Sequence, residues 1–457
     1  MNQTANNYQG VIVQQPLHDG KIYLREQKGF YQRIRRYLSS FLMLIFVGLP
    51  FIQWHGKQAI LIDITQQKIY FFSQTLYPQD LLIVGAVFVL AAFLLFYVTR
   101  LYGRVWCGYT CPQTIWMLMF NWIERRVEGS HRHSKALDQL PLSVGKVLKK
   151  SVKHFLWLFI ALMTSLVFIS YFVPARSLYQ DFFTFNSTLL VQSWVYFFML
   201  CTYVNAGWIK DKMCLHMCPY SRFQSVMFQA DTKLVTYDEK RGENRGPRKR
   251  NTEKPVGKGD CVDCGLCVEV CPVGIDIRDG LQYECINCGL CADACNDVMA
   301  KFNYKKNLIH YQWQTSPKAP WKRHITYGLL CLLSVVGLWL LVVKRSNVEV
   351  NILRDRQALY RINTEGQSEN SYTFKIINKT QTAKTYSLAI QSPQTLLIKG
   401  ETYFSIGGGE QFVQPLSVAA IEYIAQPHVP VVFTLLEHES QMSTEHISTF
   451  YRGKSAW

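Results

Sequence analysis

The chain has 457 residues, of which 49% are apolar and 14% aromatic, and 49 Lys and Arg against 32 Asp and Glu give a net charge of +17. So large an apolar fraction excludes a disordered chain, and 14 cysteines in 457 residues are too few for a small disulfide scaffold. The mean hydropathy of +0.01 averages intensely apolar blocks with strongly polar ones, a pattern that indicates membrane spans joined by soluble segments.

Five uninterrupted apolar runs predict transmembrane helices. None of them contains a charged residue, and a helix of about 19 residues spans about 28 Å, close to the thickness of the hydrocarbon core. Charged residues flank the runs, and we interpret Arg35 and Arg36 as anchors before the first one. The five runs are 38–54, 81–99, 155–173, 189–209 and 325–343.

The distribution of basic residues predicts the orientation of the chain. The short loops 55–80 and 174–188 contain only 2 and 1 Lys or Arg, whereas segments 1–37, 100–154 and 210–324 contain 6, 10 and 19. By the positive-inside rule these three segments face the cytoplasm, and the tail beyond the fifth run lies across the membrane. This asymmetry accounts for the positive charge, so we expect no nucleic-acid partner.

Two matched Cys-x3-Cys-Pro motifs follow the second and fourth runs, one ending at Pro112 and the other at Pro219. Proline suits the first turn of a helix, so each motif is expected in a loop that enters a helix near the cytoplasmic interface. Soft thiolates favour Cu(I). The same thiols could instead hold a further iron–sulfur cluster, act as redox-active dithiols, or remain unligated. They belong to Cys107, Cys111, Cys214 and Cys218.

Residues 261–295 carry eight cysteines in two copies of the spacing Cys-x2-Cys-x2-Cys-x3-Cys. In two-cluster ferredoxins, three cysteines of such a run hold one cluster and the fourth holds the other. Zinc sites use pairs rather than triplets of cysteines, and disulfides are disfavoured in the cytoplasm. We therefore expect two [4Fe–4S] clusters. The first is assigned to Cys261, Cys264, Cys267 and Cys295, and the second to Cys271, Cys285, Cys288 and Cys291.

The remaining cysteines and the histidines give weaker signals. Cys201 and Cys331 lie within the fourth and fifth runs, where a lone cysteine is usually a packing residue and a metal contact is the alternative. No histidine lies inside a run, because His55, His154 and His324 sit at the edges. This placement argues against a bis-histidine haem in the membrane.

The tail beyond Lys344 alternates apolar and polar residues with a period of two and predicts short strands over 372–377, 385–390, 412–418 and 429–436. Such strands suggest an immunoglobulin-like sandwich without a disulfide, serving as a docking module or as a solubilising cap.

The expected fold class is thus an α-helical membrane protein of five transmembrane helices, with an inserted two-cluster ferredoxin-like domain and a C-terminal all-β immunoglobulin-like sandwich. The expected domains are a cytoplasmic segment 1–37, helices one to four over 38–209 with the first motif at 107–112, a cytoplasmic segment 210–324 with the second motif and the ferredoxin domain at about 255–300, the fifth helix 325–343, and a periplasmic β domain 344–457.

Four stretches carry a family resemblance: Gly103–Thr114 (GRVWCGYTCPQT), Met213–Phe228 (MCLHMCPYSRFQSVMF), Arg241–Arg248 (RGENRGPR) and Cys261–Ala300. They resemble the cytochrome c oxidase accessory proteins of the CcoG/FixG type over nearly the whole chain, and more distantly the NapH-like polyferredoxins. The resemblance implies a multi-pass protein of the bacterial inner membrane that reduces Cu(II) to Cu(I) for assembly of a cbb3-type oxidase. It also implies that the eight cassette cysteines are cluster ligands and that Cys107, Cys111, Cys214 and Cys218 are candidate copper ligands.

The implied partners are a copper transporter or chaperone, the assembly factors of the oxidase, and a cytoplasmic electron donor that the sequence does not identify. Copper is then a substrate or a bound ion, and a homodimer is compatible with the resemblance. Two other functions stay open. One is a quinol-oxidising electron-relay subunit of a larger respiratory complex, as in NapH-like proteins, and the other is a non-redox scaffold for oxidase assembly.

Overall fold

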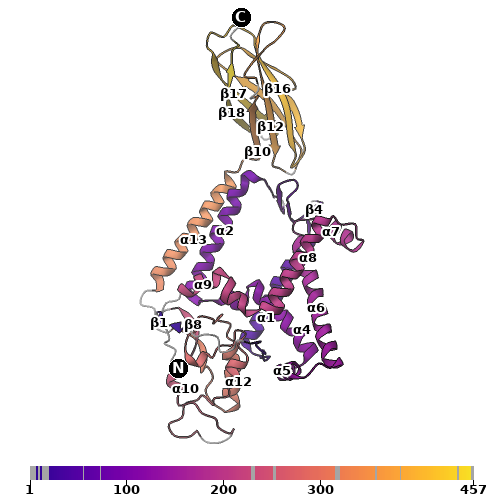
Figure 1. The fold of residues 1–457 in the computed structure, drawn as a ribbon. Helices are drawn as coiled ribbons and strands as arrows, with labels where there is room; N and C mark the ends of the chain where they lie inside the picture. The colour runs from indigo at the N-terminus through magenta and orange to yellow at the C-terminus, as the bar shows by residue number, and fades with distance from the viewer. Residues whose placement is uncertain are drawn as a thin grey trace. The chain divides into compact units, whose positions relative to one another are not determined.

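The computed structural model describes residues 20–54, 56–72, 74–227, 232–250, 254–313, 320–355, 358–380, 382–439 and 442–453, together with the strands β1 (Asn7–Tyr8) and β2 (Val11–Ile12). His55 and most of the first 19 residues of the expected N-terminal segment lie outside this part. The chain divides into two compact units, which are coloured along the sequence in Figure 1. The first consists of Met1–Ile52 and Gly85–Gly337, and the second of Gln53–Val84 and Leu338–Trp457.

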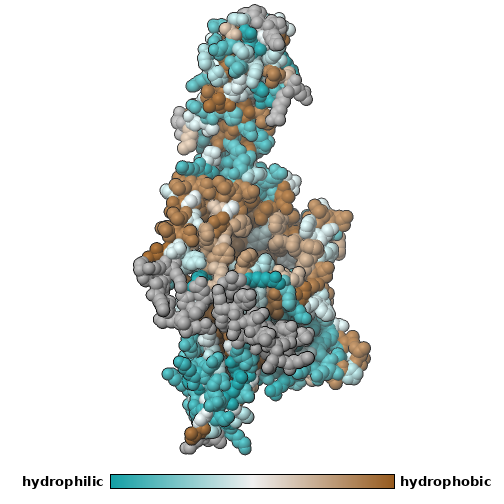
Figure 2. Space-filling model, turned by 60° about the vertical axis from the view of Figure 1, so that its left-hand side comes forward, coloured by the Kyte–Doolittle hydropathy of each residue, from teal (hydrophilic) through white to brown (hydrophobic). Residues whose placement is uncertain are grey.

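Within the described ranges, five helices are long and apolar enough to cross a membrane, which confirms the predicted number. Apolar side chains cover much of their outer surface (Figure 2). Three of these helices begin earlier than the apolar runs do, and one of them is α13, which begins at Pro320. The helix α1 begins at Phe30 and α6 begins at Val144, where the hydroxyl of Ser143 accepts a hydrogen bond from the backbone of Lys146. Polar residues of good helix propensity extend both helices beyond the apolar runs. His154, which directly precedes the third run, lies in this extension of α6.

The longer helices are α1 (Phe30–Gly48), α2 (Leu81–Tyr102), α4 (Pro112–Glu128), α5 (His131–Gln139), α6 (Val144–Ile169), α7 (Ala175–Phe183), α8 (Leu189–Tyr203), α9 (Pro219–Val226), α12 (Leu290–Lys301) and α13 (Pro320–Val343). The shorter ones are α3 (Val105–Tyr109), α10 (Glu239–Gly242), α11 (Leu266–Glu269), the 3-10 turns η1 (Leu49–Phe51), η2 (Pro78–Asp80) and η5 (Ile277–Asp279), and the π-helical segments η3 (Val204–Ile209) and η4 (Met213–Met217).

The cysteine cassette lies in a small domain of the first unit. Its strand β8 (Lys233–Tyr237) pairs antiparallel with β9 (Ile309–Trp313), so the residues before and after the cassette are held together. The helices α11 and α12 each contain the third cysteine of a triplet and pack on this pair of strands. The expected ferredoxin-like domain is confirmed, and its edges reach beyond 255–300 to include both strands.

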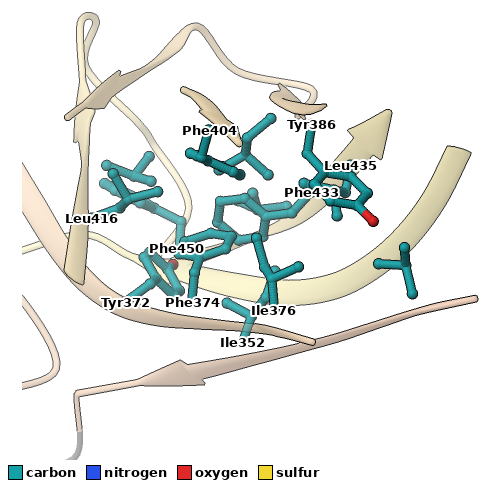
Figure 3. Packing of buried hydrophobic residues seen from close by; sticks show 14 of the residues in the cluster. Ile352, Tyr372, Phe374, Ile376, Tyr386, Phe404, Leu416, Phe433, Leu435 and Phe450 are labelled. Carbon is teal, nitrogen blue, oxygen red and sulfur yellow. The ribbon is translucent and has the colours of Figure 1, made fainter. Parts of the chain in front are cut away.

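The second unit contains the all-β domain. One sheet has the order β10–β12–β16–β14, with β11 paired to β12, and the other has the order β15–β13–β17–β18. The rings of Tyr372, Phe374, Phe433 and Phe450 meet between the two sheets (Figure 3). The four predicted strands and the sandwich are confirmed. The strands are β10 (Val348–Arg354), β11 (Arg361–Ile362), β12 (Ser368–Asn378), β13 (Lys384–Gln391), β14 (Leu396–Lys399), β15 (Tyr403–Ile406), β16 (Gln411–Ala420), β17 (His428–Glu437) and β18 (Ser443–Tyr451).

The segment after the first membrane helix also belongs to this second unit, although the sequence predicted only a loop there. It forms a β5–β6–β7 sheet and the short pair β3–β4. Lys68 donates a hydrogen bond to the carbonyl of Gly409 at 2.9 Å. Asp80 forms ion pairs with Arg345 at 2.9 Å and Lys379 at 3.2 Å. These strands are β3 (Gln53–Trp54), β4 (Lys57–Gln58), β5 (Ile60–Asp63), β6 (Lys68–Phe71) and β7 (Gln74–Leu76).

Candidate iron–sulfur and thiol site

The structure gathers the cassette cysteines around two separate cavities. One cavity is lined by the four cysteines that the sequence assigned to the first cluster, and we call these the first cluster site. The other is lined by the four assigned to the second cluster, which we call the second cluster site, and Cys267 reaches both cavities. The fourth cysteine of each run therefore lies with the other triplet, as the spacing predicted. The first cluster site consists of Cys261, Cys264, Cys267 and Cys295, and the second of Cys271, Cys285, Cys288 and Cys291.

The environment of these thiols fits iron–sulfur clusters. Burial raises the pKa of Cys271 and of Cys295 to about 12, so the thiolates need a cation in the cavity. Gly265 and Gly289 each adopt a positive φ inside a triplet, which lets the backbone bend around the cavity. The two sites differ in access, because Cys264 is exposed to solvent whereas Cys288 is buried.

The two Cys-x3-Cys-Pro motifs meet beside the cassette. Burial first, and then the neighbouring thiols, raise the pKa of Cys107 to about 11 and that of Cys214 to about 12. The thiols that act on them include Cys111 and Cys218, so all four belong to one group. We call Cys107, Cys111, Cys214 and Cys218 the four-thiol group. Among the described residues, no three Cys, His, Asp or Glu side chains converge closely enough to hold a single metal ion.

The two motifs fold in the same way. Cys111 and Cys218 are the residues directly before α4 and α9, whose first residues are the prolines, as predicted. Three positions after each of these cysteines, a buried hydroxyl donates a hydrogen bond back to the carbonyl of the first cysteine of its motif. These bonds are Thr114 to Cys107 at 2.6 Å and Ser221 to Cys214 at 2.5 Å. Neither hydroxyl was predicted from the sequence, although both stand at the same offset from the cysteines of their motif.

The first motif lies directly against the second cluster site. A Cβ atom on Gly108 would lie 2.7 Å from the carbonyl oxygen of Ile286 and 3.1 Å from the Cα of Cys288. Only glycine fits this contact without a shift of the backbone. Cys107 consequently packs in one apolar cluster with Cys288. The four-thiol group and the second cluster site are thus neighbours.

A buried arginine lies at this junction. Arg104 is 0% exposed, and its guanidinium donates to the carbonyl of Tyr283 at 2.9 Å. Its positive charge opposes the rise in the pKa of Cys107, Cys214 and Cys285 that their burial causes. Arg104 therefore favours negative charge in both the four-thiol group and the second cluster site.

The helix α1 docks on the cassette by its first turn. The carboxylate of Asp293 accepts hydrogen bonds from the backbone N–H groups of Tyr31 at 3.3 Å and Gln32 at 2.9 Å. A carboxylate is favourable there because the first turn of a helix has unpaired N–H groups and a partial positive charge. Gly289 lies beneath the ring of Tyr31, where a Cβ would come within 2.7 Å of Cγ. These contacts fix α1 against the loop of the second cluster site.

A buried ion-pair network is centred on Glu124 of α4. Glu124 contacts Lys21 at 2.6 Å and Lys210 at 3.0 Å. Burial alone would raise the pKa of Glu124, but the ammonium groups of Lys210 and Lys21 lower it to about 2. Lys210 follows the π-helix η3 and precedes the second motif. The network ties α4, which begins at the first motif, to the segment that leads into the second.

The two lone membrane cysteines lie apart from the motifs in the sequence. Cys201 lies on α8 and Cys331 on α13, and both are partly buried. The choice between a packing role and a metal contact stays a prediction for both.

Three family models match the chain. A 4Fe-4S dicluster domain matches residues 209–314, and a 4Fe-4S binding domain matches residues 81–129, which include the first motif. The Ig-like fold at the C-terminal of FixG matches residues 338–453. The matches confirm the ferredoxin and immunoglobulin-like domains.

Known proteins resemble the chain over most of its length. The nitrogen fixation protein FixG of Rhizobium meliloti is 32% identical over 91% of this chain and 89% of that protein. The protein RdxB of Cereibacter sphaeroides is 32% identical over 87% of this chain and 88% of that protein. A crystal structure of a FixG-related protein from Vibrio parahaemolyticus matches 24% of this chain and 98% of that one, at 26% identity and a TM-score of 0.22. The chain therefore belongs to the FixG/CcoG family of membrane polyferredoxins, iron–sulfur proteins of electron transfer.

Proposed function

We propose that this membrane iron–sulfur protein is a cupric reductase in which the four-thiol group receives Cu(II) and releases or retains Cu(I). The observation that carries the proposal is the contact between the two motifs and the cassette, where Gly108 brings Cys107 against Cys288. The clusters supply one-electron transfer when bound. The copper step is Cu(II) plus one electron to Cu(I), and the electron comes from a reductant on the cytoplasmic side.

The residues of the chain favour this step in two ways. Thiolates are soft ligands and stabilise Cu(I) relative to Cu(II), so a site of four cysteines favours the reduced product. Arg104 stabilises the deprotonated thiols that copper binding requires. The solvent-exposed Cys264 makes the first cluster site the natural point of access for the electron donor.

The proposal includes the cellular setting that the sequence predicted. The chain then lies in the bacterial inner membrane, with the ferredoxin domain in the cytoplasm and the β domain in the periplasm. Its partners are a copper transporter or chaperone and the assembly factors of a cbb3-type oxidase, to which the Cu(I) is destined.

The test is Cu(II) reduction by anaerobically purified, pre-reduced protein, followed with a chromogenic Cu(I) chelator. The test variant replaces all four cysteines of the four-thiol group with serine. Free thiols reduce copper unspecifically, so the matched control replaces Cys201 and Cys331 with serine instead. We expect the control to reduce Cu(II) at the wild-type rate and the test variant to lose the fast phase while keeping its iron. Equal rates in all three proteins would refute the proposed function.

A second candidate is a further [4Fe–4S] cluster in the four-thiol group, which would make the chain an electron relay. Two observations favour it: the 4Fe-4S binding domain match covers the first motif, and the four thiols do not converge on a single-ion site among the described residues. Iron analysis separates the candidates. Near eight irons per chain supports the reductase, and near twelve, falling to eight in the four-serine variant, supports the relay.

A further inference from the structure

The helix α1 buries an unusual set of residues. Its buried side chains are Gln32, Arg35 and Ser39, all of them polar. Their spacing of three and four residues places them on one face of the helix. The apolar residues Phe41 and Leu44 are 58% and 72% exposed on the outside, as expected for a helix that meets lipid. A polar stripe therefore faces the interior of the protein.

Arg35 is the most unusual member of this stripe. It is 0% exposed, and none of its three guanidinium nitrogens has a hydrogen-bond partner among the described residues. An uncompensated buried charge strongly destabilises a fold. The interpretation of Arg35 as a surface anchor is therefore wrong, whereas Arg36, with a side chain 49% exposed and paired to Glu26, keeps that role. The buried cation calls for an anion, and no side chain in the described part of the chain provides one.

The second cluster site lies where that anion belongs. The groups that act most strongly on Arg35 are the thiols of Cys288 and Cys271 and the hydroxyls of Tyr109 and Tyr311. Neither hydroxyl accepts a hydrogen bond from Arg35, and both donate elsewhere, Tyr109 to the carbonyl of Cys288 at 3.1 Å and Tyr311 to that of Asn287 at 2.5 Å. The free donors of Arg35 are left for the sulfur atoms of this site.

The first cluster site has a different charge balance. Two arginines act on its thiols and both are paired: Arg278, which acts on Cys267, with the carboxylates of Asp276 and Asp263, each at 2.5 Å, and Arg241, which acts on Cys295, with Asp260 at 2.9 Å. Their charges are compensated before any cluster binds. The duplicated cassette is therefore asymmetric, with compensated cations at the first site and an uncompensated one at the second.

We propose that Arg35 is a positioning residue that donates N–H···S hydrogen bonds at the second cluster site and raises the reduction potential there above that of the first site. Hydrogen bonds to the sulfurs and nearby charge are recognised determinants of cluster potential. Reduction of a cluster adds one negative charge. A buried cation without an anionic partner stabilises this charge more than a cation that is already paired does. The added electron is then more stable beside the four-thiol group than at the exposed first site. The inference concerns the iron–sulfur cofactors and does not depend on the identity of the electron acceptor.

The first test is an EPR-monitored redox titration of the full-length protein, purified anaerobically, for wild type, Arg35→Gln and Arg36→Gln. At the midpoint of the wild-type second cluster, Arg35→Gln is expected to lower the ratio of reduced to oxidised cluster at least tenfold, which corresponds to a shift of about 59 mV for one electron. The first cluster should change less than threefold. Arg36→Gln, the matched neighbour on the surface, should leave both clusters unchanged. Unchanged potentials in an Arg35→Gln protein with eight irons would overturn the proposal.

The second test needs no variant that removes the charge. Wild-type protein carrying 15N-labelled arginine is reduced and examined by pulsed EPR, and a 15N coupling to the second cluster is expected. The coupling should disappear in Arg35→Lys, which keeps the charge but lacks the guanidinium, and persist in Arg36→Lys. A wild-type protein without the coupling, or a coupling that survives Arg35→Lys, would overturn the assignment even if Arg35→Gln fails to retain iron.

Discussion

The two triplet glycines of the cassette provide a matched pair for testing how α1 is held. Gly265 and Gly289 have φ values of +68° and +74°, so alanine at either position costs about 1–2 kcal/mol for the left-handed backbone. Around Gly265 an added Cβ meets no atom within 4 Å among the described residues, whereas at Gly289 it lies 2.7 Å from Cγ of Tyr31. Overpacking of this kind costs about 1–3 kcal/mol. We expect Gly289→Ala to cost about 2–5 kcal/mol in total and Gly265→Ala about 1–2 kcal/mol.

The assay is the thermal loss of the iron–sulfur absorbance from anaerobic protein. The midpoint temperature should fall slightly in Gly265→Ala and much further in Gly289→Ala. Adding Tyr31→Ala to Gly289→Ala removes the ring that the new methyl group meets. In the Tyr31→Ala background, Gly289→Ala should therefore cost only the backbone term. The reasoning fails if the two glycine variants lose their absorbance at the same temperature, or if Tyr31→Ala and Gly289→Ala are simply additive.

Three further predictions rest on other contacts. Gly108→Ala should push α3 away from Cys288 and slow the reoxidation of reduced protein by Cu(II) without loss of iron, which stopped-flow absorbance measures; an unchanged rate would contradict the role of this contact. Glu124→Ala should cost about 3–5 kcal/mol because the largely buried Lys210 loses the carboxylate that compensates its charge. The pKa of Glu124 is about 2 in the folded protein against an ordinary 4.5. The difference in the free energy of unfolding between wild type and Glu124→Gln should therefore be constant above about pH 5 and shrink as the pH falls from about 4.5 toward 2. A difference that grows on acidification would refute the assignment. Asp80→Asn should destabilise the β unit by about 3–5 kcal/mol, because the buried Arg345 loses its carboxylate partner, whereas Lys379 keeps Glu349 at 2.8 Å. Thermal unfolding should reveal this loss, whereas Glu422→Gln on the exposed surface should have no effect.

Local patterns predicted much of this molecule. Each of three patterns depends only on residues that are close together in the sequence. The apolar runs predicted the helices, the cysteine spacing predicted the grouping of the cassette cysteines, and the alternation of apolar and polar residues predicted the sandwich. The burial of Arg35 could not be predicted in this way, because it depends on the docking of α1 on Asp293, 262 residues later in the chain. The same limit applies to the segment 53–84, whose partners lie in the β domain. Nothing in its own sequence indicates them.

The second unit is formed by two segments that lie far apart in the chain, and this constrains the order in which the protein can fold during synthesis. Lys68 reaches its partner Gly409 across 341 residues of chain. At a synthesis rate of about 5–20 residues per second, the contact must wait about 20–70 s after Lys68 has been made. During that interval the sheet β5–β6–β7 lacks the β-domain residues that it contacts, and Asp80 has neither of its cations. A nascent chain therefore carries a small sheet without its partner domain until its last hundred residues arrive, and a protein truncated after α13 would lack that partner domain permanently.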